Sequence, residues 1–343
     1  MAATGMVFLY NLVREFCVMG VIPVVLGMPK VMRFLEIILD YFDADPPDMV
    51  VLIDYPGFNL YLATHTRKRG IRTFFYVTPQ IWAWAPWRIN KIKRLIDKML
   101  VIFPFEVPFY EKAQVPVEYV GHPLLDRMAS FSPDVNFRSR HGLPEKLKIL
   151  ALLPGSRKSE IERNLPSMLW AASELAQKEE IVVLLALSSN KYLALCNRIG
   201  ENLKKRMSIP PVKVVQGETH QIVHHAHMAM VTSGTATLET AILGKPMIVL
   251  YYIPKVHKWL VDHTSFIKCK YIALPNIISE KRIVPEHVYC ELCPPKMLEE
   301  FLALWEDGEK RRQCFDDLRE MARRIERPGA SEKAADAILR ALS

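Results

Sequence analysis

The sequence has few cysteines and no cysteine framework. Its six cysteines are scattered along the chain: Cys17, Cys196, Cys269, Cys290, Cys293 and Cys314. Cys290 and Cys293 form a CxxC pair, but a zinc site needs a second ligand pair at a matching spacing, and none follows. A secretory signal with a basic start and a small-residue cleavage site is also missing. We therefore expect a protein of the reducing cytoplasm. We also predict no metal and no cofactor.

Long apolar runs are lacking as well. The longest, from Cys17 to Pro29, is too short to cross a bilayer and is interrupted by Pro23, so it can lie on a membrane but not span it.

Motifs of nucleic-acid binding are absent: we find no zinc finger, no RNP-like aromatic motif and no basic heptad region. Nucleic acid is therefore not an expected partner.

The composition is that of a globular protein of two domains. A chain of 343 residues is too long for one comfortable core, and its 50% apolar and 24% charged residues exclude a disordered chain and a polytopic membrane protein. The formal charge of +8 favours polyanionic partners, such as anionic lipid head groups or phosphorylated substrates.

Short apolar runs alternate with helical patterns, which predicts βα units and parallel sheets. The runs are residues 49–53, 73–77, 99–103, 117–120, 148–153, 181–187, 212–215, 228–231 and 247–252. They predict an α/β fold with two Rossmann-like domains, residues 1–135 and 145–306, joined by a linker over residues 130–147. The tail over residues 307–343 is predicted to be helical and to pack across domains or between subunits.

Ligands of open parallel sheets bind beyond the carboxyl ends of the strands, so the residues that follow each run are candidates for a site. Asp54 follows the run 49–53 in the segment IDYPGFN, where Pro56 and Gly57 force a turn. We expect its carboxylate to face the cleft between the domains. The alternative is a cap for the helix that follows.

A second candidate is the segment LPGSR, after the run 148–153. Gly155 lets backbone amides approach an anion, Ser156 can cap the next helix, and Arg157 offers a bidentate fork for phosphate. This combination predicts a diphosphate subsite. A tight turn with a solvated arginine is the alternative.

A third candidate is the segment TSGTATLE, after the run 228–231. Ser233, Gly234 and Thr235 place free N–H groups and hydroxyls at a helix N-terminus, where the helix dipole favours a diphosphate. Glu239 lies one turn further on the same side and can accept hydrogen bonds from ribose hydroxyls. A plain capped helix is the alternative.

The segment 77–99 is predicted to be an amphipathic helix preceded by tryptophans. Its apolar face holds Ile89, Ile92, Leu95 and Ile96, and its basic face holds Arg88, Lys91, Arg94 and Lys98. Trp82, Trp84 and Trp87 at its entry are candidates to contact acyl chains or the membrane interface, or else they fill the core. Glu106 and His122 follow apolar runs and can line the cleft, although a hydrogen-bonded structural histidine is the simpler interpretation.

Nine segments, taken in order, resemble the lipid-A-disaccharide synthase family. They are VMG at Val18, IDYPGFN at Ile53, PQIWAW at Pro79, PFE at Pro104, GHP at Gly121, LPGSRKSEI at Leu153, SGTATLE at Ser233, LPN at Leu274 and VPE at Val284. The resemblance implies a GT-B fold that faces a cleft and needs no metal. It also implies a peripheral enzyme at the inner face of the inner membrane of a Gram-negative bacterium.

The reaction implied by the resemblance is transfer of 2,3-diacylglucosamine from UDP-2,3-diacylglucosamine to 2,3-diacylglucosamine 1-phosphate. The products are the β-1′,6-linked lipid A disaccharide 1-phosphate and UDP, with inversion at the anomeric carbon. By the same resemblance, Asp54 is the general base, Arg157 and residues 233–235 stabilise the leaving diphosphate, and Glu239 binds ribose. A homodimer is implied too, with the C-terminal helices as the exchange element.

Three departures from the family pattern stand out. In the family, a strand and a Gly-rich SGExSGD segment, roughly 40 residues of a βαβ unit, precede the matching region. We find no match to this unit in the present sequence. We therefore expect an incomplete N-terminal domain and poor catalysis. Pro23 stands where the family usually has an acidic residue, and Tyr289 stands where a glutamine is common, which puts a polar contact there in doubt.

We also predict an apolar membrane-docking patch bordered by Lys30 and Arg33, with a place in the core of the first domain as the alternative. Its members are Val21, Ile22, Val24, Val25, Leu26 and Met28. Together with Trp82, Trp84 and Arg88, they are the candidates for acceptor or membrane contact. Two rival functions remain: another GT-B enzyme of UDP-N-acetylglucosamine, or an impaired fragment that only binds nucleotide and membrane.

Overall fold

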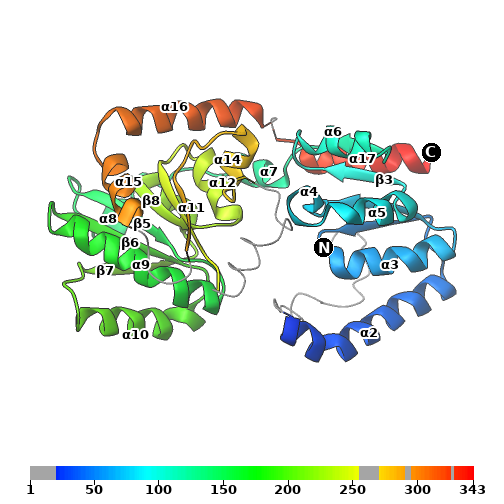
Figure 1. Cartoon of the computed structure of the whole chain (residues 1–343), viewed down its shortest axis with the longest axis horizontal. Helices are drawn as coiled ribbons and strands as arrows, with labels where there is room; N and C mark the ends of the chain where they lie inside the picture. The colour runs from blue at the N-terminus through cyan, green and yellow to red at the C-terminus, as the bar shows by residue number, and fades with distance from the viewer. Residues whose placement is uncertain (1–20, 255–269, 290–294, 326–327) are drawn as a thin grey trace.

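The computed structural model describes residues 21–254, 270–289, 295–325 and 328–343. Two parallel sheets, each flanked by helices, lie at the two ends of the longest axis (Figure 1). The predicted α/β fold is confirmed. In the part of the chain that the structure covers, no helix is both long and apolar enough to pass through a bilayer.

The first sheet has the order β1-β2-β3-β4, and all neighbouring strands are parallel. Its strands are β1 (Met49–Ile53), β2 (Arg72–Tyr76), β3 (Lys98–Val101) and β4 (Val117–Tyr119). The helices of this half are α2 (Val21–Ala44), α3 (Pro56–Lys68), α4 (Ile81–Trp84), η2 (Pro86–Arg88), α5 (Ile89–Leu95), α6 (Glu106–Lys112) and α7 (Pro123–Ala129).

Both faces of the first sheet are covered, because successive side chains of a strand point to opposite faces. Phe75 packs in a core with Leu35 of α2 and Leu62 of α3. Its neighbour Phe74 packs instead with Ala334 of α17 (Ala330–Leu342), the last helix of the chain. The end of the chain therefore completes the core of its first half.

The second sheet has the order β10-β9-β8-β5-β6-β7 and is parallel throughout. Its strands are β5 (Lys148–Leu153), β6 (Ile181–Leu187), β7 (Val212–Gln216), β8 (Met228–Thr232), β9 (Met247–Tyr252) and β10 (Glu286–Tyr289). From the central β5 the chain first builds outward through β6 and β7, then returns to place β8 on the other side. The order therefore reverses between β5 and β8, which makes this point the expected ligand site of a doubly wound sheet.

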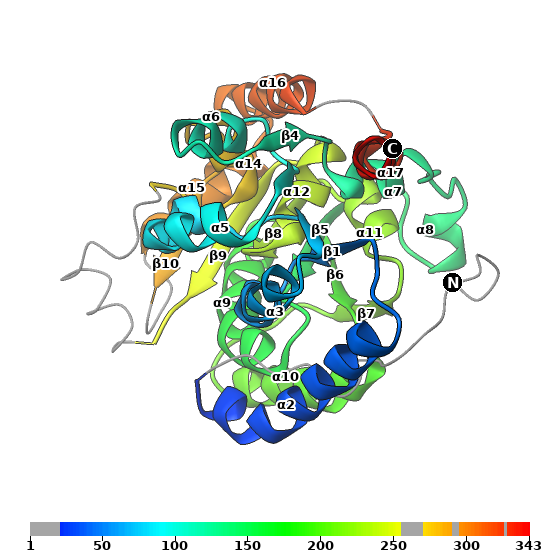
Figure 2. The same ribbon diagram turned by 90° about the vertical axis from the view of Figure 1, so that its right-hand side faces the viewer.

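Helices cover both faces of the second sheet, so its central strands β5 and β8 are almost fully buried. Helix α9 packs against one face with α10 and α15, whereas α12, α14 and α16 lie together on the other (Figures 1 and 2). The bounds are α8 (Phe137–Arg140), α9 (Lys158–Ala176), η3 (Asn190–Tyr192), α10 (Leu193–Lys204), α11 (Thr219–His225), α12 (Thr235–Ile242), α14 (Leu274–Ser279), α15 (Pro295–Trp305) and α16 (Glu309–Arg324).

The C-terminal helices belong to different halves of the molecule. Helix α16 packs on α12 and α14 of the second half, and α17 then returns to the first (Figure 1). Asp126 of α7 holds the start of α17, accepting hydrogen bonds from the amides of Gly329 (2.6 Å), Ala330 (3.1 Å) and Ser331 (3.0 Å). Although partial burial opposes it, these bonds lower the pKa of Asp126 to about 2.

Candidate functional site

A cavity of about 860 Å³ lies at the carboxyl end of the second sheet, where the strand order reverses. It is lined by the turns after β5, β6, β7 and β8 and by the segment that follows α7. All seven residues that the sequence analysis proposed for UDP line it: Gly155, Ser156, Arg157, Ser233, Gly234, Thr235 and Glu239. Two segments about 80 residues apart in sequence thus share one cavity, as the topology requires.

The turn after β5 positions a cation and two backbone donors. Gly155 has a φ of +113°, in the region that only glycine adopts readily, and Arg157 is the N-cap residue of α9. Glu160 reaches back to this turn, and its Oε2 accepts hydrogen bonds from the amides of Ser156 (2.9 Å) and Arg157 (3.2 Å). The prediction that Ser156 caps the helix is wrong, because the glutamate one turn later satisfies these amides instead.

The turn after β8 presents free backbone donors. Gly234, with a φ of +152°, is the N-cap residue of α12, and its carbonyl accepts the Thr237 hydroxyl at 2.8 Å. The Ser233 hydroxyl is already used, since it donates to the carbonyl of Ile272 at 3.1 Å. Within the described ranges, no acceptor faces the amides of Gly234 and Thr235. These two N–H groups at the positive end of a helix suit an anion.

Glu239 lies in the wall of the cavity beside a histidine that the sequence analysis missed. Its Oε1 is 3.4 Å from Nε2 of His220, and both side chains are more than four-fifths buried. His220 belongs to the segment GETHQ, which follows β7 and supplies Gly217, Glu218, Thr219 and Gln221 to the same cavity. Ligands of open parallel sheets bind beyond the carboxyl ends of the strands, and GETHQ follows the run 212–215. The same inspection of strand ends would therefore have found this segment.

The linker predicted over residues 130–147 borders the cavity and is tied to α11. Arg140 pairs with both Asp134 (2.7 Å) and Glu218 (2.5 Å), and its guanidinium lowers the pKa of both carboxyls. Gln221 accepts from the amide of Asp134 at 2.9 Å and donates to the carbonyl of Ser132 at 2.8 Å. The linker thus forms a fixed wall of the cavity.

Asp54 follows β1 in an unusual backbone conformation. Asp54 and Tyr55 have φ values of +50° and +41°, left-handed conformations that non-glycine residues adopt at a cost of about 1–3 kcal/mol each. The Asn59 amide holds this turn by donating to the carbonyls of Ile53 (3.0 Å) and Asp54 (2.6 Å). Contacts of this kind over-determine the turn, and such outliers cluster at functional sites.

The carboxylate of Asp54 is exposed and free of helix capping. The N-cap residue of α3 is Tyr55, and no side chain caps that helix, so the alternative of Asp54 as a helix cap is wrong. Asp54 does not line the cavity of the second half. We predicted that Asp54 and the UDP candidates face one cleft, whereas the structure brings only the UDP candidates together in one cavity.

Glu106 and His122 are interior groups of the first half. Glu106 accepts hydrogen bonds from Thr78 (2.9 Å), Trp82 (3.2 Å) and two backbone amides, and burial raises its pKa to about 7. His122 is the N-cap residue of α7 and accepts from the amide of Leu124 at 3.0 Å, and burial lowers its pKa to about 4. The interpretation of His122 as a structural histidine is confirmed.

The candidates for membrane or acceptor contact lie along α2 and the α4 to η2 segment. The indole N–H of the half-buried Trp82 is directed to Glu106, and Arg88 is half-buried in η2. Val21, Ile22, Val24, Val25, Leu26 and Met28 form the first turns of α2. Their side chains, like that of Trp84, lie outside the described residues, whereas Lys30 and Arg33 are exposed.

Two of the three departures from the family pattern, Tyr289 and Pro23, lie in residues that the structure describes. Tyr289 makes polar contacts after all: its hydroxyl donates to Oδ1 of Asn164 at 2.8 Å and is also close to the carbonyl of Arg163. Pro23 lies near the first described residue of α2.

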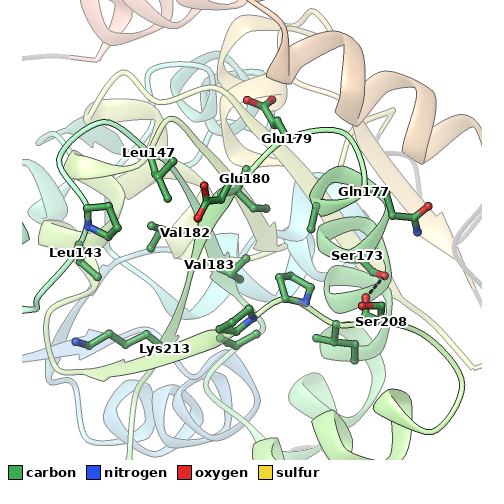
Figure 3. A pocket seen from close by; sticks show the side chains of 17 residues that line it. Leu143, Leu147, Ser173, Gln177, Glu179, Glu180, Val182, Val183, Ser208 and Lys213 are labelled. Carbon is green, nitrogen blue, oxygen red and sulfur yellow. Dashed lines mark hydrogen bonds between the residues drawn. The ribbon is translucent and has the colours of Figure 1, made fainter.

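A second cavity, of about 740 Å³, lies at the opposite edge of the second sheet (Figure 3). Three of its polar side chains bond to the protein: Ser173 donates to the carbonyl of Ser208, Lys213 donates to that of His141, and Glu179 accepts from Trp305. This cavity lies at the amino ends of β6 and β7, whereas ligands of open parallel sheets bind beyond the carboxyl ends. In the described ranges no three histidine, cysteine or acidic side chains group as metal ligands, and Cys290 and Cys293 lie outside those ranges.

Comparison with known proteins agrees with the geometry of the cavity. The family model described as lipid-A-disaccharide synthetase matches residues 1–340. The chain belongs to this family. A lipid-A-disaccharide synthase of Myxococcus xanthus is 34% identical over 100% of this chain and 88% of its own length. One of Syntrophus aciditrophicus is 38% identical over 92% and 79%.

The chain is therefore a glycosyltransferase of lipid A biosynthesis, and neither rival function is better supported. Solved structures show the GT-B fold. The UDP-GlcNAc 2-epimerase of Neisseria meningitidis, bound to UDP-GlcNAc, has a TM-score of 0.60 at 13% identity and covers 90% of this chain and 81% of its own. MurG of Acinetobacter baumannii has a TM-score of 0.53 at 13% identity and covers 91% and 78%.

Proposed function

We propose that this glycosyltransferase transfers 2,3-diacylglucosamine from UDP-2,3-diacylglucosamine to 2,3-diacylglucosamine 1-phosphate. The products are the β-1′,6-linked disaccharide 1-phosphate and UDP. The observation that carries the proposal is the single cavity at the reversal of the second sheet, where two anion-binding turns and Glu239 meet. A sugar nucleotide needs this combination: donors for a diphosphate and an acceptor for ribose hydroxyls.

The donor diphosphate would lie between the turns after β5 and β8. The free amides of Gly234 and Thr235 face it from one side, and the guanidinium of Arg157 faces it from the other. Fixed dipoles and a cation that are in place before the reaction stabilise the charge that develops on the leaving UDP. Glu239, held beside His220, would accept hydrogen bonds from the ribose.

Asp54 would act as the general base from the first half. The acceptor 6-hydroxyl oxygen attacks the anomeric carbon and gives its proton to the Asp54 carboxylate, while the bond from that carbon to the β-phosphate oxygen breaks. Because nucleophile and leaving group lie on opposite faces, the configuration inverts. An exposed carboxylate without a salt-bridge partner in the described part of the chain is available for this proton.

Moving an acyl chain from the bilayer into water costs about 0.8 kcal/mol for each methylene that becomes exposed. An enzyme that acts on acylated substrates should therefore bind them at the membrane surface. We propose that the start of α2 docks on the cytoplasmic face of the inner membrane, with Lys30 and Arg33 toward anionic head groups. Val25→Glu with Leu26→Glu should then abolish sedimentation with anionic vesicles. Unchanged sedimentation would remove the docking role.

We also propose a division into residues 1–135, 145–306 and 307–343, with a homodimer in which the C-terminal helices are exchanged. The return of α17 to the first half supports this, because a helix at the end of a connecting segment can complete the same core in a second copy. Light scattering with and without residues 330–343 would test it. A dimer that persists without α17 would contradict exchange.

The central experiment combines product analysis with nucleotide affinity. Mass spectrometry should find the disaccharide 1-phosphate from the two diacylated substrates. Arg157→Ala and Glu239→Ala should each weaken UDP binding on the order of tenfold or more, as expected for a lost charge-assisted hydrogen bond. Lys158→Ala, next in the chain but absent from the cavity lining, is the matched control. UDP affinity unchanged in both variants would move the donor site elsewhere.

A further inference from the structure

The anion-binding turn after β5 is already occupied by a carboxylate of the protein itself. Oε2 of Glu160 accepts the amides of Ser156 (2.9 Å) and Arg157 (3.2 Å), and Oε1 pairs with the guanidinium of Arg157. The proposed function places the donor diphosphate against this turn and gives it the Arg157 guanidinium, and the two amides belong to the same turn. In the structure they bind two carboxylate oxygens in the way they would bind two phosphate oxygens.

The local backbone makes room for this carboxylate. A β-carbon at position 155 would collide with the Glu160 side chain, so the glycine that lets a phosphate approach also lets the glutamate approach. The Glu160 side chain is about a quarter exposed and Arg157 about half exposed, so the carboxylate can turn into solvent without opening the core. The pair is thus a removable contact on the rim of the cavity.

We propose that Glu160 competes with the donor diphosphate for the turn after β5. Its carboxylate must leave the donors of this turn before UDP or the UDP-sugar can bind there. The inference rests on the proposed function of the cavity. When UDP binds, its diphosphate replaces the Glu160 carboxylate on the same donors. The loss of the Glu160 contacts therefore offsets part of the free energy gained from the phosphate contacts. After exchange, the carboxylate remains near the diphosphate as a like charge and favours release of UDP after transfer.

The test uses two ligands that differ only in the diphosphate. Calorimetry should measure UDP and uridine binding to the parent, to Glu160→Gln and to Glu160→Ala. We expect both variants to bind UDP roughly five- to tenfold more tightly, because charge-assisted contacts are strong but here partly screened by solvent. Uridine affinity should not change, and product release should become slower.

A matched control separates a local effect from a change in net charge. Glu162→Gln removes the same charge two residues away on α9, where the side chain pairs with Lys158 and lies outside the cavity lining. It should leave UDP affinity within twofold. Loss of the α9 cap or misfolding would weaken uridine and UDP together, which the two-ligand design detects.

The outcomes distinguish this inference from the proposed function. Equal or weaker UDP binding by both Glu160 variants, while Arg157→Ala still loses affinity, would overturn the competitor role and leave the donor site intact. Unchanged UDP affinity in Arg157→Ala and Glu239→Ala would instead overturn the donor site itself. Tightening of UDP alone in the Glu160 variants supports both.

Discussion

The two sheets of the molecule end their strands in different ways. In the second, the order reverses between β5 and β8, and the glycine turns at Gly155 and Gly234 place backbone amides around a cavity. In the first, the order β1-β2-β3-β4 shows no reversal among the described strands, and the left-handed conformations directly after β1 and β2 fall on the non-glycine residues Asp54 and Val77. Glycine adopts such turns without strain, whereas the others need tertiary contacts to hold them.

The proposed function places nucleotide binding in the second half and the reacting base in the first, so one variant should lose transfer without losing UDP binding. Asp54→Asn should lower the rate of transfer by about 10²–10⁴, because an amide keeps the shape but cannot accept the proton. UDP affinity should remain that of the parent. Transfer assays and calorimetry on the same preparation check both values.

Asp48→Asn is the matched control, since Asp48 is an exposed aspartate just before the amino end of the same strand. It should leave transfer within about twofold, as surface substitutions usually do. A turnover of Asp54→Asn close to that of the parent would end the base assignment, and the separation between the halves would need another residue.

A second prediction concerns the interior of the first half on acidification. His122 is buried and neutral, and its pKa falls from 6.5 to about 4 on folding. Its contribution to stability is therefore complete above pH 6.5 and is lost as the pH falls from 6.5 through 4, by an amount on the order of 2–3 kcal/mol. The difference between the free energies of unfolding of the first half in urea at pH 7 and at pH 4 measures this loss.

His122→Asn removes the titration and keeps the cap, because the asparagine oxygen can accept the Leu124 amide that Nδ1 accepts now. The variant should lose less stability than the parent between the two pH values. Parallel pH profiles of the two proteins would show that burial of His122 does not make the first half sensitive to acid.

The smallest effect is expected where the two halves are connected. Asp126→Ala removes the acceptor for the start of α17, and the loss of a helix cap costs about 1–2 kcal/mol. Hydrogen exchange should increase in residues 330–342 and in β2, which α17 covers, while the second half and UDP affinity remain unchanged. Asp126→Asn retains an acceptor and should lose less. Equal exchange in all three proteins would mean that packing alone holds α17.

Local patterns were enough to locate most strands. The runs 49–53, 148–153, 181–187 and 247–252 coincide with β1, β5, β6 and β9. Strand β10 was missed because Glu286 and His287 interrupt its apolar character, and it becomes a strand through pairing with β9. Pairing at a sheet edge depends on a distant segment, so a local pattern does not encode it.

The sequence by itself determined where the anion-binding turns lie, because glycine, a helix start and a nearby cation are all local features of LPGSR and TSGTATLE. Only the tertiary structure decided that these turns and GETHQ share one cavity, since the strand order brings their ends together. It also decided that α17 returns to the first half and that Glu160 accepts the amides of the turn after β5. Both outcomes depend on contacts in the folded chain: α17 packs on a sheet that is distant in sequence, and the Glu160 side chain lies close enough to the turn to accept its amides.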